Sequence, residues 1–217
     1  MKHVICYGMI CVALALSGCK DQSQQSEPPS PAPSVAPAEP APAEPTPPKS
    51  VIKATQAFFD AALNGQSDKV ESELVAGVDP DSKNPSGQTA IMLAAFNGHT
   101  RIIAMLVDFG ADVNATDMIN RTALIYASSG PYSETAQLLL DKGAKVNIID
   151  NNEKWTALMF AAAEGQTEVV KRLLDAGADV SLKDVDGDTA ADFAIQNGHN
   201  ALAKMIREYG QSVETGN

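Results

Sequence analysis

Four acidic side chains lie in one short run, DVDGDTAAD, at Asp184, Asp186, Asp188 and Asp192. Carboxylates at alternate positions are oxygen ligands of the kind that Ca²⁺ prefers, so this run is a candidate cation site. An EF-hand loop needs glycine after its third acid, and here Gly187 precedes Asp188. The spacing therefore favours a turn, and we expect no metal and no cofactor, with calcium binding kept as an alternative.

The rest of the sequence after residue 50 offers little for catalysis. It contains two histidines, His99 and His199, and no cysteine. The hydrolase motif GxSxG, the zinc motif HExxH and the phosphate-binding motif GxxxxGK are all absent from it. We therefore expect a protein that is not an enzyme.

The three cysteines, Cys6, Cys11 and Cys19, all lie near the N-terminus. This segment has one lysine at position 2, an apolar run over residues 4–16 and small residues at 17 and 18, which is the pattern of a secretory signal peptide. The run is too short to cross a bilayer, which takes about 20 residues as a helix. Residues 1–18 are therefore predicted to be a signal peptide that is removed.

The residues at the predicted cleavage point, LSGC, resemble the lipobox of bacterial lipoproteins. On that resemblance Cys19 becomes the first residue of the mature chain and carries three acyl chains, each methylene contributing about 0.8 kcal/mol of membrane affinity. The resemblance implies a lipid-anchored protein of the bacterial periplasm. Lys20 stands where an aspartate favours inner-membrane retention, so the outer membrane is preferred. The alternative is an ordinary signal peptide with a free thiol at Cys19.

A proline-rich stretch separates Cys19 from the rest of the chain. Residues 21–49 hold ten of the thirteen prolines and no aromatic residue, so they cannot form a core. Extended at about 3.1 Å per residue, such a segment reaches on the order of 90 Å. We interpret residues 19–50 as the lipidated cysteine followed by a disordered linker, either a spacer or a tail without a required length.

The chain from residue 51 onward is built from repeats. The threonine of a recurring T-A motif occurs at Thr89, Thr122, Thr156 and Thr189, a period typical of stacked repeat architectures. Each repeat combines a short alanine-rich helical pattern, a second helical pattern that glycine ends, and a polar stretch. One repeat cannot bury its own apolar face, but stacked repeats can. The predicted units are 51–86, 87–119, 120–153, 154–186 and 187–213, with a tail at 214–217.

The repeat length and the motifs T-A-L, A-A-x-x-G, L-L and G-A-D-V-N resemble the ankyrin repeat family. The resemblance implies an all-α fold, a solenoid of about five stacked helix-turn-helix units joined by finger loops. In this family the fingers and the first helices line a concave surface that binds other proteins. His99 and His199 fill the family's Gly-His step before the second helix, so we interpret them as structural.

The only tryptophan, Trp155, directly precedes a motif threonine, in a row with Gln88, Arg121 and Asp188. A tryptophan in this polar row predicts an exposed contact residue, and the alternative is an indole lying flat on a neighbouring finger. Apolar residues at the preceding finger tip, acids around them and the first-helix ends complete the predicted partner-binding surface. Its residues are Phe96, Asn97, Met118, Ile119, Arg121, Ser129, Glu153, Trp155, Glu164, Asp186 and Asp188.

The third unit departs from the pattern, because it reads SSGPYS where others read FNGHT or AEGQT. Proline cannot take the positive φ that glycine takes, so Gly130 is expected to turn the chain one residue before Pro131. The altered loop is either tolerated drift or a feature made for one partner.

Removal of residues 1–18 leaves 15 basic and 27 acidic residues, a net charge of −12. Nucleic acid is an unfavourable partner, because phosphate binding needs clustered Lys and Arg. We expect a monomeric, membrane-tethered binding module whose protein partner has a basic surface and is an enzyme that it assists or inhibits, or a toxin. The alternative is a structural spacer, or a calcium-binding envelope protein, without a specific protein ligand.

Overall fold

The computed structural model describes residues 52–214. The predicted signal peptide, Cys19 and the proline-rich linker lie outside these residues. The described part contains ten α-helices: α1 (Gln56–Leu63), α2 (Ser67–Val75), α3 (Ala90–Phe96), α4 (Thr100–Asp108), α5 (Ala123–Ser128), α6 (Ser133–Asp141), α7 (Ala157–Ala163), α8 (Thr167–Asp175), α9 (Ala190–Gln196) and α10 (Asn200–Glu214).

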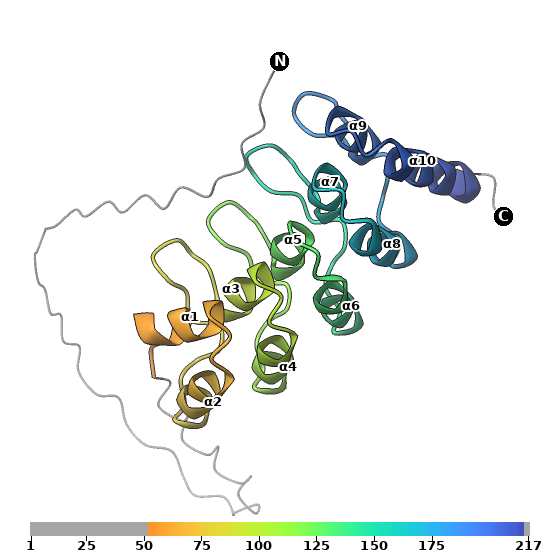
Figure 1. Cartoon of the computed structure of the whole chain (residues 1–217). Helices are drawn as coiled ribbons and strands as arrows, with labels where there is room; N and C mark the ends of the chain where they lie inside the picture. The colour runs from red at the N-terminus through yellow and green to blue at the C-terminus, as the bar shows by residue number, and fades with distance from the viewer. Residues whose placement is uncertain (1–51, 215–217) are drawn as a thin grey trace, which may run out of the picture. The chain divides into compact units, whose positions relative to one another are not determined.

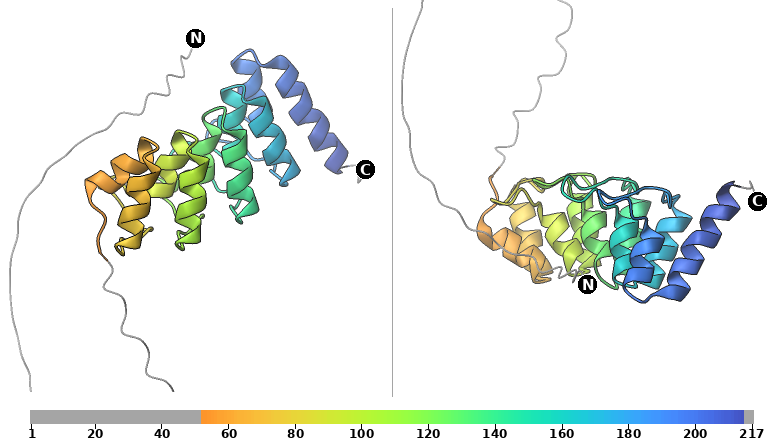
Figure 2. Two further views of the ribbon diagram at one scale, coloured as in Figure 1. Left: turned by 60° about the horizontal axis from the view of Figure 1, so that its bottom comes forward. Right: turned by 90° about the horizontal axis from the view of Figure 1, so that it is seen from above.

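The helices form pairs that stack side by side. The first helices α1, α3, α5, α7 and α9 make one row and the second helices a parallel row (Figure 1). The loops between one pair and the next, which we call fingers, all project on the same side, beside the first helices (Figure 2). The predicted all-α solenoid of five helix pairs is confirmed. Among the described helices none is both long and apolar enough to cross a bilayer.

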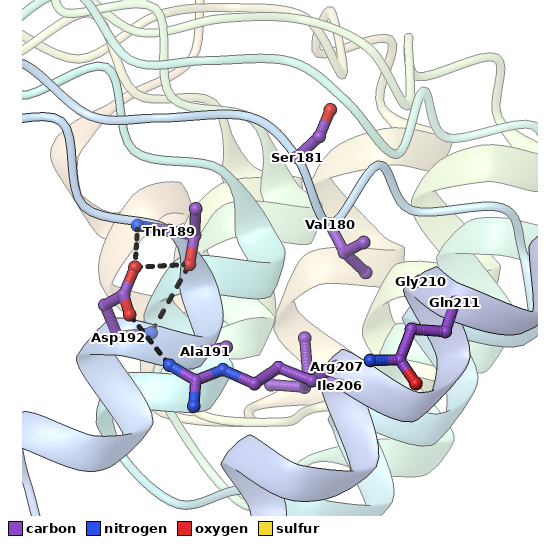
Figure 3. A pocket seen from close by; sticks show the side chains of 9 residues that line it. All are labelled: Val180, Ser181, Thr189, Ala191, Asp192, Ile206, Arg207, Gly210 and Gln211. Carbon is purple, nitrogen blue, oxygen red and sulfur yellow. Dashed lines mark hydrogen bonds and ion pairs between the residues drawn. The ribbon is translucent and has the colours of Figure 1, made fainter. Parts of the chain in front are cut away.

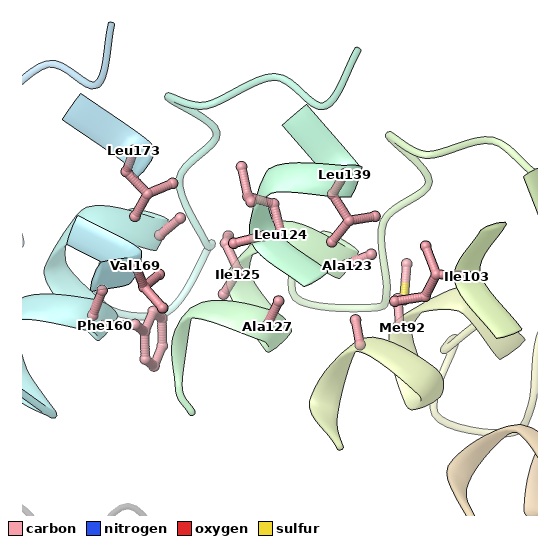
Figure 4. Close-up of a cluster of buried hydrophobic side chains, with 14 of the residues drawn as sticks. Met92, Ile103, Ala123, Leu124, Ile125, Ala127, Leu139, Phe160, Val169 and Leu173 are labelled. Atoms are coloured by element: carbon pink, nitrogen blue, oxygen red, sulfur yellow. The ribbon is translucent and has the colours of Figure 1, made fainter. Parts of the chain in front are cut away.

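Small residues on the first helices let the pairs approach one another. Ala94, Ala127, Ala161 and Ala194 occupy the same position in four successive units, and each is completely buried. Larger side chains on the second helices, such as Leu139 and Leu173, fill the space behind them (Figure 4). Removing a buried leucine side chain typically costs about 2–5 kcal/mol, a large part of the net stability of a small domain. The shared core therefore makes each unit depend on its neighbours.

A carboxylate or amide side chain closes the turn of each finger. Asp117 Oδ1 accepts hydrogen bonds from the backbone N–H groups of Ile119 and Arg121 at 2.9 and 2.8 Å. Equivalent acceptors in the other fingers are Asn84, Asp150 and Asp184. These bonds give an acceptor to backbone N–H groups that lie outside any helix or strand. They therefore fix the shape of the finger tips.

Each finger tip has one residue in a left-handed backbone conformation. These residues are Gly87, Asn120, Lys154 and Gly187, which directly precede Gln88, Arg121, Trp155 and Asp188. Two of these residues are glycines, and the other two are Asn120 with φ 65° and Lys154 with φ 60°. Asparagine tolerates this conformation better than most residues, whereas lysine gains nothing from it. Lys154 is therefore a strained position in the third finger.

The third unit departs from our expectation. Gly130 does not adopt a positive φ, so it does not turn the chain early, and that prediction was wrong. The ring of Tyr132 instead lies against Gly98 of the preceding unit, and a Cβ at Gly98 would come within 2.2 Å of it. His99 contacts Gly65 in the same way, and its Nε2 lies 3.0 Å from the carbonyl oxygen of Leu63. Tyr132 therefore takes the place that His99 and His199 occupy in the second and fifth units.

The last unit ends differently from the others. Helix α10 continues through Gly210, although glycines at the equivalent positions, such as Gly177 with φ 81°, end the second helices of earlier units. A Cβ at Gly210 would lie 2.9 Å from Cγ2 of Val180, so glycine lets α10 pack closely on the fourth finger. Tyr209 also donates a hydrogen bond of 2.7 Å to the carbonyl oxygen of Leu174 at the end of α8. The longer α10 thus covers the end of the stack.

Candidate functional site

The finger residues predicted to face a partner contact the first helix of the following unit. Gln88 Nε2 donates to the hydroxyl of Tyr126 on α5 at 2.8 Å. The guanidinium of Arg121 lies 5.2 Å from the ring centroid of Phe160 on α7. The indole of Trp155 lies 4.3 Å, between ring centroids, from Phe193 on α9. These contacts repeat the same step along the stack and join each finger to the next helix pair.

Trp155 is buried, with 8% of its surface exposed. Its indole packs on Phe193 and also on Phe160, at a centroid distance of 4.8 Å and an interplanar angle of 64° from the latter. The prediction of an exposed contact residue is therefore corrected, because two aromatic rings from neighbouring first helices cover the indole. Asp188 holds the equivalent position in the last finger, and the described residues contain no further unit for it to contact. It accepts a hydrogen bond of 2.8 Å from Gln196 of its own unit instead.

Arg121 pairs with a buried carboxylate on this face. Its Nε and Nη2 both lie 3.3 Å from Oδ2 of Asp150, whose side chain is completely buried. Asp150 Oδ1 also accepts from the backbone N–H of Glu153 at 2.9 Å, so the buried carboxylate has several partners. Breaking a buried ion pair on one side costs about 3–5 kcal/mol, because a charge is left without compensation. Arg121 thus helps to hold the third finger in place.

Tyr126 joins two fingers at the centre of the face. Its hydroxyl accepts the hydrogen bond from Gln88 and donates one of 2.8 Å to Oδ2 of Asp117. Burial, more than the hydrogen bond to Asp117, raises the pKa of Tyr126 to about 12. The tyrosine therefore stays protonated at physiological pH and acts as a structural hydrogen-bonding group.

Other predicted contact residues are exposed. Phe96, at the end of α3, has 49% of its surface exposed and meets Tyr126 edge-on at a centroid distance of 6.2 Å. Met118, at the tip of the second finger, is 74% exposed. Glu153, Glu164 and Asp186 are exposed as well. These residues are accessible to a partner.

The remaining predicted residues bond within the protein. Asn97 donates a hydrogen bond of 2.7 Å to the carbonyl of Leu63, and Ser129 donates one of 2.8 Å to the carbonyl of Tyr126. The carbonyl of Ile119 accepts from the backbone N–H of Asn151 at 2.8 Å. All three residues are half-buried, so they support this face more than they present it.

Sequence reasoning missed two exposed apolar residues on the fingers, Ile149 and Val185, which are 38% and 50% exposed. Val185 follows Met118 by two repeat lengths, so the repeat register could have identified it. It also missed that the aromatic rings at Tyr126, Phe160 and Phe193 recur with the period of the motif threonines. That recurrence is the signal that could have predicted the burial of Trp155.

The acidic run Asp184–Asp192 does not assemble a cation site. Within residues 52–214, no group of three His, Cys, Asp or Glu side chains is placed to hold a metal ion. Asp184 closes its own finger turn, and Asp192 accepts from the Thr189 hydroxyl at 2.7 Å and from Arg207 at 3.1 Å. Hydrogen bonds from Thr189, with a smaller contribution from Arg207, hold the pKa of Asp192 below its usual value.

The pair of Asp192 and Arg207 borders a pocket of about 370 Å³ between the fourth finger, α9 and α10 (Figure 3). Ala191 and Asp192 stand where earlier units carry large buried pairs such as Leu158 and Met159, so the last unit leaves this space open. The ion pair connects α9 with α10 across the pocket. We interpret it as part of the end of the stack.

Comparison with known proteins supports this architecture. A search of the curated proteins returned no significant match. A family model described as Ankyrin repeats (3 copies) matches residues 58–150 and 147–217, which is more than half of the chain. With five stacked helix pairs, fingers on one side and this match over the whole stack, the chain belongs to the ankyrin repeat family.

Proposed function

We propose that this protein is a non-enzymatic, membrane-tethered binding module of the bacterial periplasm, and that it holds a protein partner on the face formed by the fingers and the first helices. Ankyrin repeats generally mediate protein–protein interaction, and proteins built from them are typically non-enzymatic binding modules. The tether is the lipid on Cys19, and the outer membrane is the favoured location. The partner is an enzyme that the module assists or inhibits, or a toxin that it blocks.

One observation supports the choice of this face. Phe96 and Met118 remain exposed on a face whose neighbouring residues Gln88, Arg121 and Trp155 are engaged within the protein. Large apolar side chains left exposed beside polar groups are typical of protein-binding sites. The net charge of −12 after removal of residues 1–18 favours a partner with a basic surface.

Site-specific photo-crosslinking in intact cells tests the proposal. A photoreactive residue at position 96 or 118 is expected to capture one defined protein, which is then purified and titrated against the unmodified module. The matched control is position 75 at the end of α2, where Val75 is 71% exposed on the opposite row of helices. Equal capture from positions 75 and 118, or no binding by the purified captured protein, would contradict the proposed function.

A further inference from the structure

The tips of the fingers form a continuous ridge. Met118 lies on Gly87 of the first finger, where an added Cβ would be 2.8 Å from its Cγ. Asn120 Nδ2 donates a hydrogen bond of 2.7 Å to the carbonyl of Ile149, which joins the second and third fingers. The backbone N–H of Val185 donates at 3.1 Å to the carbonyl of Glu153, which joins the third and fourth.

Three large apolar side chains stand exposed along these joined fingers. They are Met118 at 74%, Ile149 at 38% and Val185 at 50% exposure, one on each of three successive fingers. We call them the fingertip ridge. Exposed methionine and branched aliphatic side chains on fingers that hydrogen bonds join to one another are a favourable surface for burial against a partner, at about 25 cal/mol per Å².

The surface below the ridge is already occupied. Arg121 pairs with Asp150, and Trp155 packs on Phe193, so both are used in joining units. A partner that displaced either would leave a buried carboxylate or two aromatic rings uncovered. The accessible apolar groups nearest to these residues along the chain are those of the finger tips.

Charge is distributed unevenly along the tips. The first tip, residues 84–88, carries no charged residue, whereas the fourth, residues 184–188, carries Asp184, Asp186 and Asp188 and no basic residue. The tips between them, residues 117–121 and 150–155, carry Asp117, Asp150 and Glu153 against Arg121 and Lys154. The excess of acid therefore increases along the stack: one acid stands against one base at the second tip, two against one at the third, and three against Lys183, which directly precedes the fourth tip.

We propose that the fingertip ridge binds a polypeptide segment with two parts, apolar side chains that lie over Met118, Ile149 and Val185 and a cluster of Lys or Arg that meets the acidic residues around Asp186 on the fourth finger. This inference rests on the proposed function and names the chemistry of its partner. Apolar contacts provide the affinity, and the acidic fourth tip sets the orientation of the segment and accelerates association.

The test uses the mature full-length protein and a synthetic peptide with a leucine-rich half and a lysine-rich half, titrated by fluorescence anisotropy. A second peptide carries glutamate in place of every lysine. We expect the lysine peptide to bind and the glutamate peptide to bind at least about tenfold more weakly. The double variant Met118→Ser/Val185→Ser and the variant Asp186→Lys should each weaken the lysine peptide by about tenfold, a change that corresponds to the loss of one well-placed contact.

Matched control variants make the same kinds of substitution at exposed positions outside the finger tips. Val75→Ser and Phe109→Ser remove exposed apolar side chains from the ends of second helices, and Asp175→Lys makes the same charge change at the end of α8. These controls should alter peptide affinity by less than about twofold, since they lie outside the ridge and surface changes leave the fold intact. Equal weakening by the controls, or equal binding of both peptides, overturns the proposal.

Two other occupants are separate outcomes. Concentration-dependent self-association that Met118→Ser/Val185→Ser abolishes would show that the ridge binds a second copy, and binding to phosphatidylethanolamine–phosphatidylglycerol vesicles that the same variant abolishes would show a lipid site. Either result overturns the proposal. If a protein captured from position 96 binds the ridge variants as tightly as the unmodified module, the ridge inference fails while the proposed function stands.

Discussion

The indole of Trp155 lies between the rings of Phe160 and Phe193, which belong to the first helices of its own unit and of the next. An aromatic contact of this kind adds about 0.5–1.5 kcal/mol beyond the burial of apolar area. Because the two rings lie on different units, the same side chain helps to fix the last helix pair on the stack. Its contribution is thus to folding, and a test of stability follows directly.

Replacing Trp155 with alanine is expected to lower the free energy of unfolding by about 3–5 kcal/mol, the usual cost of removing a buried large aromatic side chain. Urea melts followed by circular dichroism measure this without the tryptophan signal. The control Phe96→Ala, at a half-exposed position, should change stability by less than about 1 kcal/mol. A wild-type midpoint for Trp155→Ala, or a water-like emission maximum of the native tryptophan, would contradict the burial.

Lys154 is the second residue-scale case, because its φ of 60° strains a lysine. Lys154→Gly should raise the free energy of unfolding by about 0.5–1 kcal/mol. Glycine relieves the left-handed strain, and the greater entropy of glycine in the unfolded chain offsets part of that gain. Asn120→Gly, at the equivalent position, should instead destabilise, since it removes the bond from Nδ2 to the Ile149 carbonyl. Thermal melts of the pair measure the difference. Destabilisation by Lys154→Gly would count against the strain.

At the scale of the element, α10 shows how a helix can use a residue that normally ends one. Gly210 lies inside the helix and faces Cγ2 of Val180 on the fourth finger. Glycine inside a helix costs about 1 kcal/mol relative to alanine, yet here an added Cβ at 2.9 Å would collide with a stiff β-branched side chain. The close approach of helix and finger therefore offsets the poor helix propensity.

This balance predicts a non-additive pair of substitutions. Gly210→Ala alone should destabilise, or fail to give the usual gain of about 1 kcal/mol, because the new methyl group contacts Val180. In a Val180→Ala background the same substitution should stabilise by about that amount. A double-mutant cycle from urea melts gives the coupling. Additive effects of the two substitutions would show that the contact between α10 and the finger does not control this position.

The whole stack could be predicted from the sequence because its information is local and repeated. The motif threonines at Thr89 and Thr122, the alanine pairs and the glycines recur with one common period, and each recurrence reports the same contact between neighbouring units. The environment of Trp155 is harder to predict, because its partner Phe193 belongs to the following unit, more than one repeat length along the chain. The polar residues in its row indicated an exposed surface, and only the recurrence of aromatic residues at Tyr126, Phe160 and Phe193 pointed to a ring that could cover the indole.

We propose that the attachment of the molecule to a membrane depends on one residue outside the stack. The anchor that we propose is the lipid on Cys19, on the resemblance of LSGC to a lipobox, and the acidic chain would itself be repelled by anionic headgroups. Three acyl chains hold a protein firmly, whereas none leaves it to diffuse. Retention should therefore depend on Cys19 and on no other cysteine.

Cys19→Ser is expected to release the protein from the membrane fraction or leave it unprocessed, and to abolish incorporation of labelled palmitate. Fractionation after an alkaline wash, with immunoblotting for size, measures both effects. The control Cys11→Ser changes a cysteine in the segment predicted to be removed, so its mature product should be retained and labelled as the wild type is. Because the folded units share no residue with the anchor, the released Cys19→Ser protein should still melt with the wild-type midpoint. Mature Cys19→Ser protein that stays in the washed membrane would show that another attachment holds it.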